Sequence, residues 1–185
     1  RGSVKETFYD AYECPCQITE EEERAFCAGV YYKAYQKLGA HPGTYGGVRG
    51  TYFAVWAPNA IRVSVVGDFD RWDGRRLPMH RMPMSGIFEL FVPGVKAGTA
   101  YQYEVKIKGG NIQRKSDPYG NGTQEPPSVL SVVADLGEFF WQDDEWMKER
   151  VKYESREVPV SIYETDITAW KNSRDLIEFV KETGY

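Results

Sequence analysis

Residues 101–111 read Tyr-Gln-Tyr-Glu-Val-Lys-Ile-Lys-Gly-Gly-Asn, and this stretch decides the fold class. Apolar and polar side chains alternate from 101 to 108, which is the period of a strand with one buried face. The pattern predicts core positions at Tyr101, Tyr103, Val105 and Ile107 and solvent positions at Gln102, Glu104, Lys106 and Lys108. Because Gly-Gly-Asn is typical of a hairpin turn, residues 112–115 are expected to return as a second strand.

Similar short segments flank this hairpin on both sides. Further strands are expected at 51–56, 62–66, 87–92 and 129–133, where β-branched and aromatic residues gather between turn residues. Trp56 lies within an alternating strand and is expected to pack in the core. Many short strands with no helix between them predict a mainly β fold, an immunoglobulin-like β-sandwich over residues 46–137.

The segment before the sandwich, residues 1–45, is expected to be helical. Thr19 and Glu22 have the spacing of a capping box, and Glu20–Glu23 place negative charge in the first turn. Apolar residues at helical spacing extend the predicted helix over 17–38. Gly29 is the point at which it could divide in two, and Gly39 is expected to end it.

The region after the sandwich changes character twice. Residues 138–157 form an acidic linker that carries Phe139, Phe140, Trp141 and Trp146. In residues 158–185, an apolar strand is expected at 158–163. A helix is expected from Asn172 to Gly184, with Leu176, Ile177, Phe179 and Val180 on its apolar face. One strand and one helix are half of a βαβ crossover and cannot bury both faces, so a second, α/β domain is expected to continue beyond them.

Composition excludes several classes of protein. Lys and Arg number 23 against 27 Asp and Glu, a net charge of −4, which argues against a nucleic-acid partner. Aromatic residues make up 15% of the chain, which excludes general disorder. No apolar run has the roughly 20 residues of a membrane helix, so no membrane partner is expected.

The cysteines favour a cytoplasmic protein. Cys14, Cys16 and Cys27 are odd in number and are expected to be reduced thiols. His41 and His80 lie far from the cysteines in sequence, so neither a metal site nor a cofactor is expected.

Several motifs occur in a fixed order along the chain. They are Tyr-Gln-Lys-Leu-Gly-Ala-His-Pro at 35–42, Phe-Ala-Val-Trp-Ala-Pro-Asn-Ala at 53–60, Val-Val-Gly-Asp-Phe-Asp-Arg-Trp-Asp-Gly at 65–74, Arg-Lys-Ser-Asp-Pro-Tyr at 114–119 and Val-Ser-Ile-Tyr-Glu at 160–164, with Trp170 after them. In this order they resemble the bacterial 1,4-α-glucan (glycogen) branching enzymes. The resemblance implies a family-48 carbohydrate-binding module, followed by the first strand and helix of a family-13 glycoside hydrolase (β/α)8 barrel.

The resemblance also implies an activity for the parent enzyme. Such enzymes cut an α-1,4 linkage and rejoin the fragment through α-1,6, with a carboxylate nucleophile and an acid/base carboxylate. In the family these carboxylates lie on later barrel strands, so no catalytic residue is expected in this chain, which alone should be inactive. Glu164 and Asp166 are interpreted as structural strand-end residues. Thr165–Trp170 depart from the family's usual sequence at this point.

The resemblance implies a sugar site at Trp72 and Arg114. In glycogen-sensing relatives of this module, the Trp that follows Gly-x-Phe-x-x stacks on sugar, and Trp72 matches it. A second stacking Trp falls at Arg114, and a Lys of those relatives falls near Glu104. The expected partners are therefore α-glucan and the enzyme's own catalytic barrel, on which the aromatic linker would dock. Packing of Trp72 against the sandwich edge is the alternative.

Three other functions stay open at this point. They are a stand-alone glycogen-binding or regulatory module, the N-terminus of a related debranching enzyme, and an immunoglobulin-like domain that binds another protein.

Overall fold

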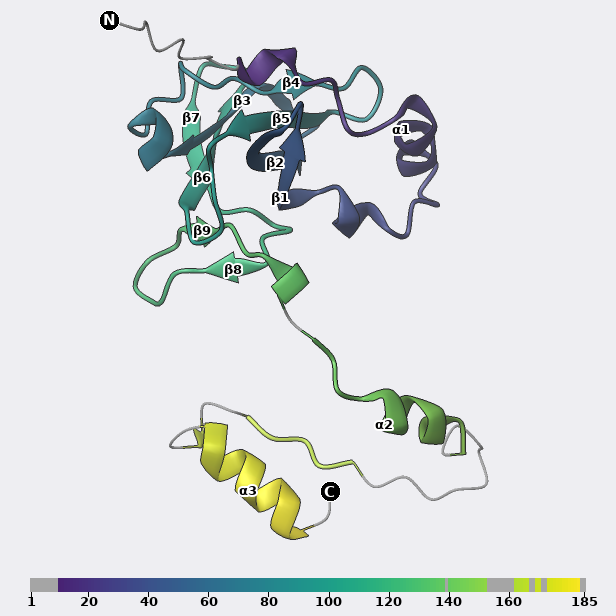
Figure 1. The fold of residues 1–185 in the computed structure, drawn as a ribbon. Helices are drawn as coiled ribbons and strands as arrows, with labels where there is room; N and C mark the ends of the chain where they lie inside the picture. The colour runs from purple at the N-terminus through teal and green to yellow at the C-terminus, as the bar shows by residue number, and fades with distance from the viewer. Residues whose placement is uncertain (1–9, 139, 153–161, 167–168, 171–172, 184–185) are drawn as a thin grey trace, which may run out of the picture. The chain divides into compact units, whose positions relative to one another are not determined.

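The computed structural model describes residues 10–138, 140–152, 162–166, 169–170 and 173–183 (Figure 1). The chain divides into two compact units at residue 138, and each is described by itself.

The first unit consists of two antiparallel sheets (Figure 1). One sheet has the order β1 (Gly39–Tyr45), β2 (Val48–Trp56), β5 (Ile87–Pro93) and β4 (His80–Arg81). The other has the order β3 (Ala60–Gly67), β6 (Ala100–Ile107), β9 (Ser131–Val132) and β8 (Gly122–Thr123), and β7 (Ile112–Lys115) pairs with β6. Short 3-10 turns lie at η1 (Ala11–Glu13), η2 (Ala34–Gln36), η3 (Asp68–Asp70) and η4 (Leu136–Glu138).

The two sheets share one core, as an immunoglobulin-like sandwich requires. Side chains from β2 and β5 meet side chains from β3 and β6, including Phe53, Val55, Leu90, Val63, Val65, Tyr101 and Tyr103. The rings of Phe53 and Tyr101 lie 4.9 Å apart between centroids and join the two sheets edge to face. The predicted fold class is confirmed.

The alternation along β6 is confirmed at Tyr101 and Tyr103 and fails at Gln102 and Ile107, and Glu104, expected in solvent, is largely buried as well. Tyr101 and Tyr103 are fully buried, and the hairpin pairs Val105 with Gln113. Gln102, expected in solvent, is only 7% exposed. The loop after β3 folds back over this face, where Ser64 Oγ donates to the Gly74 carbonyl at 2.6 Å. Ile107, at the end of the strand, is 37% exposed instead of buried.

The N-terminal helix is shorter than predicted. Helix α1 spans Glu20–Cys27, and the capping box is present: Thr19 N donates to Glu22 at 2.9 Å and Glu22 N donates to Thr19 Oγ1 at 3.2 Å. Gly29 has φ +73°, a left-handed conformation that ends the helix. Residues 39–45, expected in the helical segment, instead form β1 and pair with β2.

Residues 10–38 form a layer on the outer face of the first sheet, which we call the N-terminal layer. Its buried side chains include Ile18 and Leu38, which pack with Ala54, Met82 and Ile87 of the sandwich. The core prediction for Trp56 was wrong, because Trp56 shares a face of β2 with Ala54, opposite to the core side chains Phe53 and Val55. Trp56 lies at the outer end of β2, where its indole Nε1 donates to Ser85 O at 2.9 Å, and its ring stands 5.8 Å from Phe26, with the residue 52% exposed.

The second unit contains short helices. They are α2 (Asp144–Glu149), η5 (Arg150–Lys152) and α3 (Ser173–Thr183). The predicted helix is present as α3, with Leu176, Phe179 and Val180 half-buried and Ile177 exposed. Most of the expected strand at 158–163 lies outside the described residues, as do Phe139, Asn172 and Gly184; Ile162 and Tyr163 have no regular structure. No helix in the described ranges has the length and apolar character needed to cross a membrane.

Candidate functional site

Trp72 lies in the loop that follows β3, just after η3. Arg71 and Trp72 have φ values of +62° and +59°. A left-handed backbone costs an ordinary residue about 1–2 kcal/mol, and here two such residues follow one another. The loop must therefore be held by contacts elsewhere.

Asp70 provides those contacts from within the loop. The residue is 2% exposed, and its Oδ1 accepts hydrogen bonds from Gly67 N at 2.9 Å and Trp72 N at 3.0 Å. Trp72 N also donates to Gly67 O at 2.9 Å. Burial raises the pKa of the Asp70 carboxyl, although these backbone donors act in the opposite direction. Asp70 thus fixes the backbone that presents the indole.

A second aspartate orients the ring itself. The indole Nε1 of Trp72 donates to Asp68 Oδ1 at 2.7 Å, a short bond because its acceptor is charged. The Trp72 residue is half-buried. The ring is therefore held in one orientation while part of it reaches solvent.

Arg114 meets Trp72 directly. Arg114 Nη2 donates to Trp72 O at 2.8 Å, and its guanidinium carbon stands 5.7 Å from the indole centroid. That distance is within the range of a cation–π contact. The structure thus brings together the two residues singled out in the sequence.

Glu104 has a structural part at the edge of this site. Arg62 Nη2 lies 2.6 Å from Glu104 Oε1, and the Glu104 side chain is 13% exposed. Gly74 passes so close to the Glu104 carboxylate that a Cβ there would collide with it. Glu104 and Arg62 therefore form a packed ion pair beneath the loop.

The loop beyond Trp72 is closed by a further pair. Arg75 Nε and Nη2 each donate to a carboxylate oxygen of Asp73 at 2.8 Å. The Arg75 hydrogen bonds hold the pKa of Asp73 well below its usual range. The sequence analysis did not single out Asp68, Asp70 or Asp73. Their spacing around Trp72 in Gly-Asp-Phe-Asp-Arg-Trp-Asp-Gly, with Asp residues that favour turns, was the available signal.

The cysteines and one histidine lie closer together than the sequence suggested. Cys14, Cys16 and His80 line one pocket, although 64 positions (80 − 16) separate the last two. All three cysteines are free thiols. In the parts of the chain that the structure describes, no group of three His, Cys, Asp or Glu side chains has an arrangement that could hold a metal ion.

Much of the sandwich is similar to a known domain family. Residues 37–120 match the family described as carbohydrate-binding module 48 (isoamylase N-terminal domain). Over 96% of its length the chain is 39% identical to a 1,4-alpha-glucan branching enzyme of Nitrosococcus oceani and covers 25% of that enzyme. Enzymes of the same name from Synechococcus sp. (strain JA-3-3Ab) and Rhodospirillum rubrum are 43% and 41% identical, with 93% and 100% of this chain and 23% and 27% of those enzymes covered.

The chain therefore spans about a quarter of the length of the curated relatives that it matches.

Proposed function

We propose that the sandwich of this chain holds α-glucan for a branching reaction of glycogen biosynthesis. The premise is that the chain carries a family-48 carbohydrate-binding module and corresponds to the N-terminal part of 1,4-α-glucan branching enzymes. The binding surface in this proposal is Trp72 with Arg114. The reaction itself belongs to a catalytic barrel elsewhere in the parent enzyme, and this chain alone is inactive.

The oriented indole of Trp72 is the observation that carries the proposal. A glucosyl ring presents a flat apolar face with hydroxyls around its rim, and aromatic rings stack on such faces. The Asp68 hydrogen bond holds the indole at 2.7 Å, so little side-chain entropy is lost when sugar binds. The Arg114 guanidinium beside the ring supplies N–H donors for the rim hydroxyls.

The proposal includes a division of the chain. The N-terminal segment ends at residue 38 and the module begins with β1 at residue 39, not at residue 46 as expected; residues 138–157 are an aromatic linker and 158–185 the first strand and helix of the barrel. Support for docking on the barrel comes from the linker, where Phe140, Trp141 and Trp146 are 81%, 75% and 61% exposed. Exposed apolar side chains of this size in a short segment are typical of an interaction surface. The proposed location is the cytoplasm, which is consistent with free thiols at all three cysteines.

A native gel with and without glycogen tests the proposal. The wild-type chain should be retarded by glycogen, and Trp72→Ala should weaken that binding roughly five- to tenfold, because about 1–1.4 kcal/mol of stacking is lost. Trp146→Ala, which removes an exposed Trp of the second unit, is the matched control and should bind like wild type. An unretarded wild-type chain, or a Trp72→Ala chain that binds as tightly as wild type, would refute sugar binding at this surface.

A further inference from the structure

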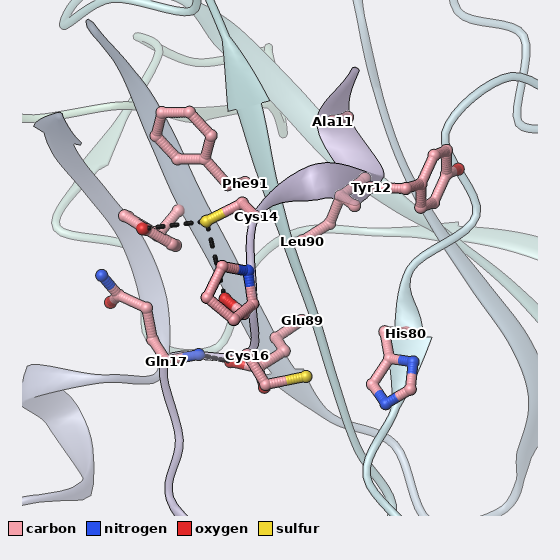
Figure 2. Close-up of a pocket in the computed structure, with 11 residues that line it drawn as sticks. Ala11, Tyr12, Cys14, Cys16, Gln17, His80, Glu89, Leu90 and Phe91 are labelled. Atoms are coloured by element: carbon pink, nitrogen blue, oxygen red, sulfur yellow. Dashed lines mark hydrogen bonds between the residues drawn. The ribbon is translucent and has the colours of Figure 1, made fainter. Parts of the chain in front are cut away.

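A pocket lies under the N-terminal layer, away from Trp72. Its volume is about 340 Å³, and it opens between residues 11–17 and the outer face of the first sheet. Figure 2 shows the segment with Cys14 and Cys16 passing over Glu89, Leu90 and Phe91 of β5. Trp72 follows β3, in the other sheet. The two places are therefore on different sheets of the sandwich.

Glu89 lines this pocket, and its two carboxylate oxygens differ in their hydrogen bonds. The residue is 5% exposed, and its Oε2 accepts hydrogen bonds from Gln17 N at 3.1 Å and Ile18 N at 3.3 Å. Its Oε1 is buried and has no hydrogen bond of good geometry among the described residues, while the Cys16 thiol interacts with the same carboxylate. A buried carboxylate is costly to leave without donors, and the two backbone N–H groups and the Cys16 thiol hold Glu89 in place as the charged group of the lining.

The walls of the pocket are aromatic. Tyr52 and Phe91 lie 4.6 Å apart between ring centroids, and Tyr12 and His80 belong to the same lining. Tyr12 is fixed by its hydroxyl, which donates to Pro78 O at 2.9 Å. Aromatic walls with a few placed polar groups are the usual construction of a small-molecule site.

Tyr52 and Cys16 of the lining keep their protons at neutral pH. Burial raises the pKa of Tyr52 to about 12, and the Tyr52 hydroxyl lies 3.1 Å from Cys14 Sγ. Burial, and after it the Glu89 carboxylate, raises the pKa of Cys16 to about 12. The pocket thus combines one carboxylate with neutral hydroxyl and thiol groups.

We infer that this pocket is a second α-glucan site, which takes the end of a short linear α-1,4-linked chain. The inference rests on the proposed function for the class of sugar. An anion is disfavoured by the Glu89 carboxylate, and a purely apolar ligand would leave the polar groups of the lining without partners. The volume is at the small end of the roughly 300–1,000 Å³ of ligand sites, so it fits a short oligosaccharide rather than a cyclic one.

The two histidines of the chain make a selective test possible by NMR. His80 lines the pocket, whereas His41 does not and instead has its Nε2 2.9 Å from Leu38 O. The full chain, labelled in His and Trp, is titrated with maltotriose, β-cyclodextrin and spermidine. The His80→Asn variant assigns the His80 ring signals. Maltotriose should shift these signals in a saturable manner, while β-cyclodextrin and spermidine leave them in place and the His41 ring stays unchanged with all three.

Two variants measure the contribution of the lining. Glu89→Gln should weaken maltotriose binding, as reported by His80, roughly tenfold, because the charged acceptor is lost. Glu89 also accepts two backbone hydrogen bonds, so this variant is used only if its His41 signal is native. Tyr12→Ala, at a residue 50% exposed, removes one wall and should weaken binding at least about fivefold. Tyr35→Ala, at a residue 59% exposed outside the pocket, is its control.

The outcomes separate this inference from the proposed function. His80 signals that stay still with maltotriose, respond equally to β-cyclodextrin, or move only with spermidine would overturn the pocket site. So would equal binding by Tyr12→Ala and Tyr35→Ala. A Trp72 Nε1–H signal that fails to move, beside a saturable shift at His80, would overturn the Trp72 site and leave the pocket standing.

Discussion

Replacing Glu23 should strongly destabilise the first unit. Glu23 projects from α1 and is fully buried. Its Oε1 accepts three hydrogen bonds, from Met84 N at 2.9 Å and from Ser85 N and Ser85 Oγ at 2.8 Å each. Because Met84 and Ser85 precede β5, this carboxylate fastens the N-terminal layer to the sandwich. Replacing Glu23 with Ala leaves all three donors without their acceptor.

The expected magnitude follows from those contacts. A hydrogen bond to a charged group contributes about 1.5–3 kcal/mol, and a buried donor left unsatisfied costs a similar amount. The three bonds share one acceptor, and Glu23 Oε2 is itself buried without a partner, which already reduces the net gain. We therefore expect Glu23→Ala to lower the free energy of unfolding by about 3 kcal/mol, which corresponds to a fall in Tm of roughly 6–12 °C for a chain of this size.

Urea unfolding followed by circular dichroism measures this loss. Glu21→Ala is the matched control, because Glu21 lies in the same helix and is exposed. Its effect should stay within about 0.5 kcal/mol of wild type. If Glu23→Ala and Glu21→Ala shift the urea midpoint equally, the carboxylate does not fasten the layer and the argument fails.

Two further predictions concern pH and one glycine. Desolvation raises the pKa of Glu23, but the hydrogen bonds from Ser85 and Met84 outweigh it and lower the net pKa below the ordinary 4.5. The stability advantage of wild type over Glu23→Gln should therefore be constant above pH 4.5 and disappear as the pH falls through the lower folded-state pKa. Urea midpoints of both proteins, measured from pH 7 to 3, test this. An advantage that grows on acidification would contradict it. Gly39 has φ +107°, and a Cβ there would lie 2.8 Å from Tyr119 O, so Gly39→Ala should lose at least about 2 kcal/mol in the same assay. At Gly43, in the same strand, a Cβ would meet the Tyr52 ring at 3.6 Å, and Gly43→Ala should lose less than about 1 kcal/mol; similar losses at both positions would refute the steric argument.

The sequence predicted those elements whose signal is local. The two-residue period of β6 and its glycine turn predicted the hairpin, because backbone alternation and turn geometry depend on neighbouring residues. The capping box at Thr19 was predicted for the same reason. Gln102 was placed wrongly because the loop after β3 covers its face of the strand. Trp56 was placed wrongly because alternation alone does not show which face of β2 meets the other sheet.

In the candidate site, too, the individual residues could be predicted from the sequence, but the contacts between distant segments could not. Trp72 and Arg114 were singled out by resemblance, but their direct contact depends on the pairing of β7 with β6. Asp70 can hold the loop only because Arg71 and Trp72 adopt a left-handed backbone conformation, and the spacing of residues does not predict that conformation. Likewise, His80 reaches the Cys14–Cys16 segment only because β4 lies at the edge of the sheet beneath it.

The N-terminal layer separates the unit of homology from the unit of folding. The match to the carbohydrate-binding family begins at residue 37, yet Ile18 and the Glu23 carboxylate already belong to the packed body of the sandwich. A protein cut at the family boundary would present the outer faces of β2 and β5 to water, with Ala54 and Ile87 uncovered. The portable piece for engineering a fusion therefore includes residues 10–36 as well as the range that matches the family.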